Sequence, residues 1–214
     1  MSSGSDSKAS SALSVTGERA DHGPGLLLII SGPSGAGKTT IAHRVEKALD
    51  AEFSISMTTR PQSPKDTDGE DYFFVSPRRF DGAVAAGELL EWAEVFGNRY
   101  GTPRRFVEDR VAAGRLVILE IDVDGAEQVK AKAPDALAIF ILPPSEDELL
   151  ERLRGRGRED ETTIQRRFAK AQGEIARARG GDTYDHFVTN DDLERAVGET
   201  IDLVQRRLAA EAKR

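Results

Sequence analysis

The chain has 214 residues, and its 30 Lys and Arg against 37 Asp and Glu give a formal net charge of −7. This acidic balance does not favour a general nucleic-acid binder, and the lack of cysteine excludes disulfides, thiolate catalysis and cysteine metal sites. Apolar runs such as 26–30 and 136–142 are too short to cross a bilayer, and 1–24 has no apolar core typical of a secretory signal. We therefore expect a cytoplasmic protein with no membrane partner and no nucleic-acid partner.

The first 24 residues are rich in Ser, Gly and small polar residues. Such a segment cannot bury enough apolar surface to offset its chain entropy, so we expect 1–24 to be a disordered tail. Order is expected to begin at Gly25, and the apolar run Leu26–Ile30 is typical of a strand buried on both faces of a parallel sheet. A glycine-rich segment and a predicted helix over 41–49 follow.

The glycine-rich segment 32–39 matches the pattern G-x-x-x-x-G-K-[ST]. Glycines let successive backbone N–H groups face phosphate oxygens, and the following helix points its positive end at the same anion. Lys38 supplies a positive charge to the β- and γ-phosphates, and the Thr39 hydroxyl can ligate Mg²⁺. The order of strand, loop and helix predicts a nucleoside triphosphate site.

Further buried strands are predicted over 116–121, 136–142 and 186–189. The predicted helices around them cover 104–113, 124–132, 145–154, 160–179 and 191–212. This alternation predicts an α/β fold with a parallel sheet flanked by helices. Glu120 and Asp122 come at the carboxyl end of one strand, where ligands collect in such sheets, and Glu120 is a candidate Mg²⁺-side acid.

Two segments interrupt the alternation. Within 53–102, short strands are predicted over 53–57, 71–75 and 91–95, with a turn at Gly97-Asn98, which together indicate a small, mostly β insertion. Residues 145–170 carry dense charge of both signs and contain Gly155 and Gly157, a composition that favours a mobile flap over a core helix.

Several motifs in this order resemble the guanylate kinase family over Gly25 to about Leu208. They are SGPSGAGKTT (31–40), SMTTR (56–60), GEDYFFV (69–75), LEWAE (90–94), GNRYGT (97–102), LEID (119–122), PPS (143–145), RLRGRG (152–157), RR (166–167) and TNDDL (189–193). The resemblance implies an Mg²⁺-dependent kinase that converts ATP and GMP to ADP and GDP. It also implies a phosphate-loop core (25–52, 103–144 and 171–214), a GMP-binding insertion (53–102) and a helical lid (145–170).

The family's residue roles carry over onto matching positions. The implied ATP-binding residues are Gly32, Pro33, Ser34, Gly35, Ala36, Gly37, Lys38, Thr39, Thr40 and Asn190. The implied GMP-binding residues are Ser56, Arg60, Tyr72, Glu91, Tyr100, Thr102 and Asp122. The implied catalytic residues are Lys38, Arg60, Arg152, Arg156 and Arg167, and the metal ligands are Thr39 and Glu120.

The chemistry of these residue types suits the two ends of GMP. A carboxylate such as Glu91 accepts from both adjacent donors of guanine, N1–H and the 2-amino group, which adenine lacks. Arginines bind phosphate through a planar fork and stabilise the charge that spreads over a transferring phosphoryl group. The acceptor oxygen already belongs to an ionised phosphate, so we expect no dedicated general base.

The sequence departs from the family at the acceptor phosphate site. Members commonly read T-T-R-x-x-R-x-G-E, but the second arginine is Ser63 here, and Lys65 offers charge without the bidentate fork. Acidic residues at 66 and 68 are also unfavourable near a phosphate unless they point to solvent. We therefore expect a raised KM for GMP.

Two other functions stay open at this point. A kinase of the same fold that phosphorylates a sugar phosphate, such as ribose 1,5-bisphosphate, needs no guanine-reading carboxylate. A non-catalytic guanylate kinase-like interaction module needs no intact phosphate loop. The sequence leaves the oligomeric state undetermined.

Overall fold

The computed structural model describes residues 25–155 and 160–213, so the expected tail and Arg156 lie outside the described residues. Its central sheet has five parallel strands in the order β2-β7-β1-β8-β9. The strands are β1 (Leu26–Ser31), β2 (Glu52–Phe53), β7 (Leu116–Glu120), β8 (Leu137–Leu142) and β9 (His186–Thr189). This confirms the predicted α/β class and its parallel sheet.

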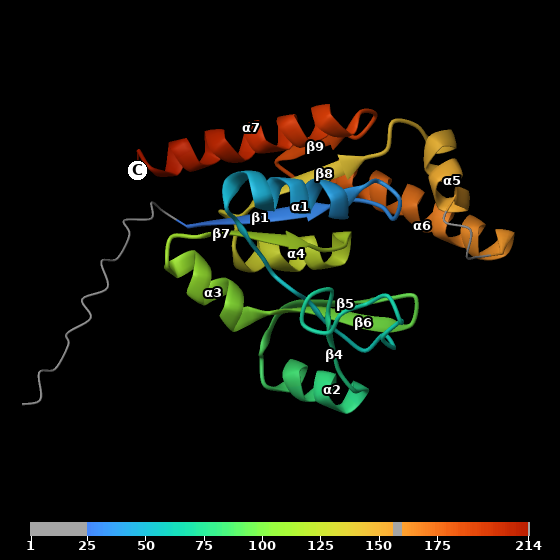
Figure 1. The fold of residues 1–214 in the computed structure, drawn as a ribbon, viewed down its shortest axis with the longest axis horizontal. Helices are drawn as coiled ribbons and strands as arrows, with labels where there is room; N and C mark the ends of the chain where they lie inside the picture. Colours follow the sequence, from blue (N-terminus) through green and yellow to red (C-terminus); the bar gives the residue numbers. More distant parts are fainter. Residues whose placement is uncertain (1–24, 156–159, 214) are drawn as a thin grey trace, which may run out of the picture.

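Both faces of the sheet are covered by helices, which explains the continuous apolar strands. Alternate residues of β1 face opposite layers: Leu28 packs in the cluster under α1 (Lys38–Leu49) and α7 (Leu193–Glu211), and Ile29 packs in the other. The second layer contains α3 (Arg104–Ala112) and α4 (Val123–Lys132), which lie below the sheet in Figure 1. The predicted helices are confirmed, and the largest shift is at α1, which begins at Lys38 instead of 41.

A second sheet forms most of the insertion, with strand order β4-β3-β6-β5. Its strands are β3 (Met57–Thr58), β4 (Phe73–Phe74), β5 (Leu89–Val95) and β6 (Asn98–Pro103). The strand predicted over 53–57 is wrong as one unit, because Phe53 pairs with β7 in the core sheet and only Met57 joins the second sheet. A turn between β5 and β6 is present, but it lies at Phe96-Gly97, one residue earlier than predicted, with both residues in the left-handed region.

Helix α2 (Pro77–Ala85) of the insertion was not predicted. The Ser76 side chain accepts from the Arg79 N–H at its start, and Pro77 occupies the first turn, where its fixed φ suits a helix. Phe80 and Ala83 of α2 pack against Leu89, and Figure 1 shows α2 on the far side of this sheet from the core. Ser76 followed by Pro77 was the sequence signal that could have predicted the start of this helix.

The charged segment expected to form a flap contains most of two packed helices, α5 (Glu146–Gly155) and α6 (Glu161–Gly180), both close to their predicted bounds. Leu149 and Leu153 of α5 are buried against Ile164 and Ala171 of α6, so the segment has its own small core. Helix α6 is continuous across residues 170 and 171, where the sequence places the end of the lid.

Across residues 25–155 and 160–213, no helix combines the length and apolar character needed to span a membrane.

Candidate functional site

A cavity of about 510 Å³ lies where the phosphate loop, the second sheet and α6 meet. Predicted residues from all of these elements line it together: Gly32, Ser34, Gly35, Gly37, Lys38, Thr39, Thr40, Tyr72, Glu91, Tyr100, Glu120, Asp122 and Arg167. A second hollow next to the loop is lined by Gly35, Gly37, Thr40, Arg152 and Asn190, together with Asp191 and Leu193. Of the predicted residues that the structure describes, five line neither space: Pro33, Ala36, Ser56, Arg60 and Thr102.

The phosphate loop depends on glycine at the positions where it turns. Gly35 and Gly37 have φ values of 95° and 92°, in the left-handed region that glycine adopts without strain. A Cβ on Gly37 would also lie 2.3 Å from Nδ2 of Asn190. That amide nitrogen donates a 2.8 Å hydrogen bond to the carbonyl of Ala36, so the end of β9 holds the loop in shape.

The two polar side chains at the end of the loop, Lys38 and Thr39, already have hydrogen-bond partners. Lys38 Nζ donates to the carbonyls of Gly32 at 2.7 Å and Pro33 at 3.1 Å, which folds the side chain back over the loop. The Thr39 hydroxyl donates to Oε1 of Glu120 at 2.8 Å and joins the start of α1 to the end of β7. This hydroxyl and carboxylate supply hard oxygen ligands side by side, next to the glycine-rich loop.

Glu91 is a buried carboxylate on β5, with 3% of the residue exposed. The hydroxyl of Thr102, opposite it on β6, donates to Oε1 at 2.6 Å. Burial raises the pKa of Glu91 to about 7, and the nearby charge of Asp122 acts in the same direction. A partly desolvated carboxylate with acceptor capacity left is suited to bind paired N–H donors.

Asp122 has a structural role in addition to lining the cavity. Its side chain caps α4 by accepting from the Gly125 N–H at 2.9 Å, and burial raises its pKa. Ser56 is also expected to read guanine. It precedes β3, and its carbonyl accepts from the Phe73 N–H at 2.9 Å.

The predicted phosphate ligands of the acceptor gather around Arg60. The guanidinium carbon of Arg60 is 5.2 Å from the centroid of the Tyr72 ring, which itself packs edge-on to Tyr100 at 5.6 Å. Burial raises the pKa of Tyr72 to about 12, so its hydroxyl stays a neutral donor at physiological pH. Arg60 also forms a 3.0 Å ion pair with Asp66.

Asp66 and Asp68 were expected to be unfavourable near a phosphate unless they point to solvent. Both instead accept hydrogen bonds from nearby backbone N–H groups. Asp66 pairs with Arg60 and accepts from the Ser63 N–H at 2.7 Å, and the Arg60 hydrogen bond lowers the pKa of its carboxyl. Asp68 accepts from the Phe74 N–H at 2.9 Å. Both carboxylates therefore shape the loop, and Asp66 also neutralises the arginine.

The predicted arginines beyond the loop lie in different surroundings. Arg152 donates to the carbonyl of Asn190 at 3.1 Å and pairs with Glu148. Arg167 points to the tip of the β5–β6 hairpin, with its guanidinium carbon 5.0 Å from the centroid of the Phe96 ring.

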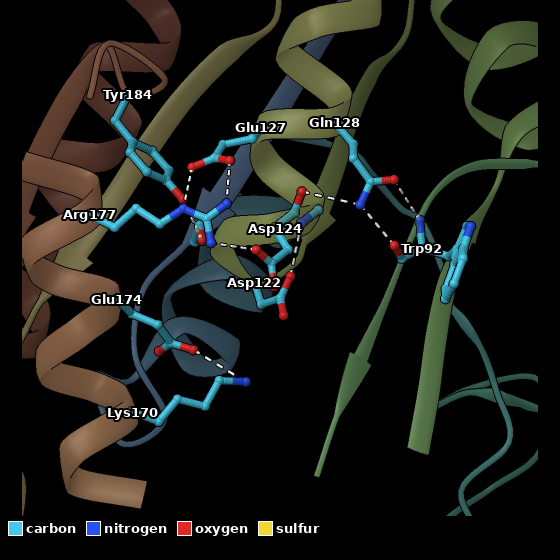
Figure 2. Close-up of polar contacts among 11 residues, drawn as sticks. Trp92, Asp122, Asp124, Glu127, Gln128, Lys170, Glu174, Arg177 and Tyr184 are labelled. Carbon is cyan, nitrogen blue, oxygen red and sulfur yellow. Dashed lines mark hydrogen bonds and ion pairs between the residues drawn. The ribbon is translucent and has the colours of Figure 1, made fainter. Parts of the chain in front are cut away.

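The sequence analysis missed several residues that line the cavity. They are His43, Phe53, Glu70, Asp71, Ala93, Val95, Phe96, Ile121, Lys170 and Glu174. Lys170 follows Arg167 at i+3, so helical spacing was an available signal for it. Figure 2 shows Lys170 and Glu174 on α6, where they form a 3.5 Å ion pair.

Polar side chains join α4 to α6 beside the cavity (Figure 2). Arg177 of α6 forms ion pairs with both Asp124 and Glu127 of α4.

In the described part of the chain, no group of three or more His, Asp or Glu residues is arranged to hold a metal ion. A metal ion held by the Thr39 and Glu120 pair would therefore complete its coordination with substrate phosphates and water.

Comparisons with known proteins point to one family. The model of the family described as guanylate kinase matches residues 25–207. The guanylate kinase of Anaeromyxobacter dehalogenans (strain 2CP-C) is 48% identical over 193 residues, which cover 89% of this chain and 84% of that protein. The guanylate kinase of Myxococcus xanthus (strain DK1622) is 49% identical over 177 residues, 82% of this chain and 84% of that protein.

A solved structure is similar in fold as well. The crystal structure of guanylate kinase from Anaplasma phagocytophilum has a TM-score of 0.71 and 31% sequence identity, covering 90% of this chain and 88% of that one.

Proposed function

The chain belongs to the guanylate kinase family, and we propose that its cavity binds GMP beside ATP and transfers the ATP γ-phosphoryl group, giving GDP and ADP. The chain is thus an ATP:GMP phosphotransferase. The observation that supports this most is the buried Glu91 carboxylate, which lines the same cavity as the phosphate-loop lysine.

The acceptor end is assigned by its chemistry. Glu91 accepts from guanine N1–H and the 2-amino group, with Thr102 holding the carboxylate and with Ser56 and Asp122 as further guanine readers. At the other end of GMP, the phosphate binds Arg60 and the hydroxyls of Tyr72 and Tyr100.

The donor end is assigned to the loop 32–40 and Asn190. Backbone N–H groups and the start of α1 bind the triphosphate, and Lys38 leaves its carbonyl partners to bind the β- and γ-phosphates. Thr39 and Glu120 would hold Mg²⁺, which when bound offsets phosphate charge and orients ATP. The 2.8 Å hydroxyl–carboxylate pair fits this ion, which prefers oxygen ligands and is commonly held by one carboxylate plus phosphates.

Transfer rests on positioning and on positive charge. An oxygen of the GMP phosphate attacks the γ-phosphorus in line, and the bond to the ADP oxygen breaks. Arg60, Arg152 and Arg167, with Lys38, stabilise the charge on the transferring group, and Arg156 is assigned the same role from the sequence. The acceptor oxygen is already ionised, so no general base is required.

The same proposal divides the chain by function. Residues 25–52, 103–144 and 171–214 form the ATP-binding core, 53–102 bind GMP, and 145–170 act as the lid that covers the phosphates. Because β2 belongs to the core sheet, we place the functional start of the GMP-binding unit just after Phe53. We further propose that the protein works in the cytoplasm, where both nucleotides are available.

The experiment is ADP production from Mg-ATP with GMP, dGMP, AMP or ribose 1,5-bisphosphate as separate acceptors. Rapid turnover with GMP and almost none with AMP is expected. The Glu91→Gln variant should lose GMP turnover and keep ATP binding, because its amide cannot accept from both guanine donors. Turnover of the sugar phosphate without turnover of GMP would overturn the proposal.

A further inference from the structure

Strand β5, which carries Glu91, is hydrogen-bonded along its outer edge by side chains of a core helix. Among the described residues β5 is the last strand of its sheet, so its outer edge has no neighbouring strand. Gln128 of α4 donates to the Trp92 carbonyl at 2.8 Å, and the Trp92 N–H donates to Oε1 of Gln128 at 3.3 Å. Figure 2 shows this side-chain amide reaching from α4 to the strand.

A second contact holds the same edge two residues earlier. Nζ of Lys132, one turn further along α4, donates to the carbonyl of Leu90. The backbone on either side of Glu91 is therefore fixed to α4, at Leu90 by an ammonium and at Trp92 by an amide. This leaves little freedom for the backbone of Glu91 itself.

The carboxylate of Glu91 also lies directly against α4. A Cβ added to Gly125 would be 2.6 Å from Oε2 of Glu91, so only a glycine permits this approach. Thr102 holds the other oxygen, Oε1, from β6. Helix α4 thus determines both where the strand runs and where the carboxylate sits.

From these contacts we propose that Gln128 is a positioning residue for base selection: it holds β5 at Trp92 so that the Glu91 carboxylate faces both donors of guanine. The inference rests on the proposed function, because it concerns how the same site recognises the 2-amino group. Displacement of a recognition group by about 1 Å can lower a rate by about 100-fold, so a strand shift of this size would weaken selection strongly.

Gln128 suits this role because a primary amide donates and accepts at once. A glutamate at 128 still accepts from the Trp92 N–H but repels the Trp92 carbonyl, and a leucine does neither. Gln128→Glu and Gln128→Leu therefore form a graded pair. Matched controls are Gln205→Glu and Gln205→Leu, because Gln205 is an exposed residue on α7.

The test compares kcat/KM for GMP with kcat/KM for IMP, which keeps N1–H but lacks the 2-amino donor. For the native enzyme a large preference for GMP is expected. Gln128→Leu should reduce the GMP-to-IMP ratio by about 10- to 100-fold, Gln128→Glu by an intermediate amount, and the KM for ATP should stay within about twofold. Both Gln205 variants should keep the native ratio.

A merely structural role would give a different result. It would lower the thermal unfolding temperature and reduce GMP and IMP turnover in parallel, and an unchanged ratio of this kind would overturn the inference. If Gln128→Leu does not fold, Gln128→Glu decides the question with the same ratio. Absence of any GMP turnover in the native enzyme would instead refute the proposed function, so the two failures are distinguishable.

Gly125→Ala provides an independent arm, because its methyl group would push Oε2 of Glu91 without touching the strand edge. The same loss of GMP preference is expected. Gly198→Ala on α7 is the matched control, since nothing lies within 4 Å of its Cβ. A Gly125→Ala enzyme with a native GMP-to-IMP ratio would contradict the placement of Glu91 by α4.

Discussion

The carboxylate of Asp66 lies 3.0 Å from the guanidinium of Arg60, the residue assigned to the GMP phosphate. Asp66 also accepts from the backbone N–H of Ser63, at the position where the family commonly has a second arginine. Without substrate, the acceptor phosphate site thus holds an internal anion. If Arg60 binds the GMP phosphate as proposed, GMP has to compete with Asp66 for this guanidinium.

Ser63→Arg is therefore expected to lower the KM for GMP by about tenfold, because a charge-assisted hydrogen bond contributes about 1.5–3 kcal/mol and part of it is spent against Asp66. The value of kcat should change little, since the new group binds the acceptor phosphate and not the transferring one. Initial rates at saturating Mg-ATP and varied GMP measure both constants.

Ser63→Lys is the control for that substitution, because it adds charge without a planar fork and should give a smaller decrease in KM. An equal or higher KM for GMP in Ser63→Arg would show that position 63 does not contact the phosphate.

Glu91 predicts a pH dependence of stability. Its folded pKa of about 7 exceeds its ordinary value of 4.5, so the folded protein holds a proton that the unfolded chain releases. The unfolded state then binds fewer protons between these two pH values, and the free energy of unfolding falls as pH rises through this window. By pH 8, ionisation of Glu91 lowers the free energy of unfolding by about 3 kcal/mol.

Glu91→Gln, which is neutral throughout, should be more stable than the native protein at pH 8 and should lose that advantage at pH 4.5. Urea unfolding of both proteins at these two pH values is the measurement. Two half-buried carboxyls, Asp122 and Glu174, are present in both proteins, so the difference reports Glu91 together with its electrostatic coupling to Asp122. A pH-independent difference would mean that folding does not raise the pKa of Glu91.

The contact between Thr39 and Glu120 predicts a change in metal dependence. Glu120→Gln keeps the size of the side chain and its acceptor for the Thr39 hydroxyl, but it removes the negative charge. The Mg²⁺ concentration for half-maximal activity should rise about tenfold or more at fixed ATP, since Mg²⁺ binds carboxylate oxygen far better than amide oxygen.

Glu127→Gln is the comparison for this experiment. Glu127 pairs with Arg177 and does not line the cavity, so its loss should affect stability and leave the Mg²⁺ titration unchanged. The same Mg²⁺ dependence of activity in the native enzyme and in Glu120→Gln would show that Glu120 does not bind the metal.

Strands β1, β7 and β8 of the core sheet were predictable because they are apolar runs buried on both faces, which few other environments require. The phosphate loop was predictable because one local requirement, a backbone that turns its N–H groups toward a phosphate, determines the spacing of its glycines, Lys38 and Thr39. The split of 53–57 was not, because which sheet a short strand joins depends on partners such as Ile118, far along the chain.

The contacts that align the site were the least predictable part. Gln128 looks like an ordinary polar residue on a helix face, and its bond to Trp92 spans 36 residues of sequence. Asp66 and Asp68 look unfavourable beside a phosphate until their backbone partners are known. Residue type indicates what a side chain can bind, whereas only the fold shows which partner it meets.

The tip of the β5–β6 hairpin gives a last prediction. Phe96 has a positive φ of 50° and is 39% exposed, an unusual combination for a bulky side chain. The charged groups of Arg166, Arg167 and Lys170 lie 5.4, 5.0 and 5.1 Å from its ring centroid. The negative face of one ring thus attracts the basic side of α6, and Arg167 is held at the cavity.

Phe96→Leu keeps an apolar residue but removes the ring, so Arg167 should be less well placed and kcat should fall about tenfold, with a smaller change in the KM for GMP. Phe96→Tyr keeps the π face and should retain most of the activity. Replacing Phe96 with progressively fluorinated phenylalanines separates the two explanations. If the cations recognise the π face, kcat falls stepwise with fluorination at nearly constant shape, whereas an unchanged kcat across the series means that the ring acts only by packing.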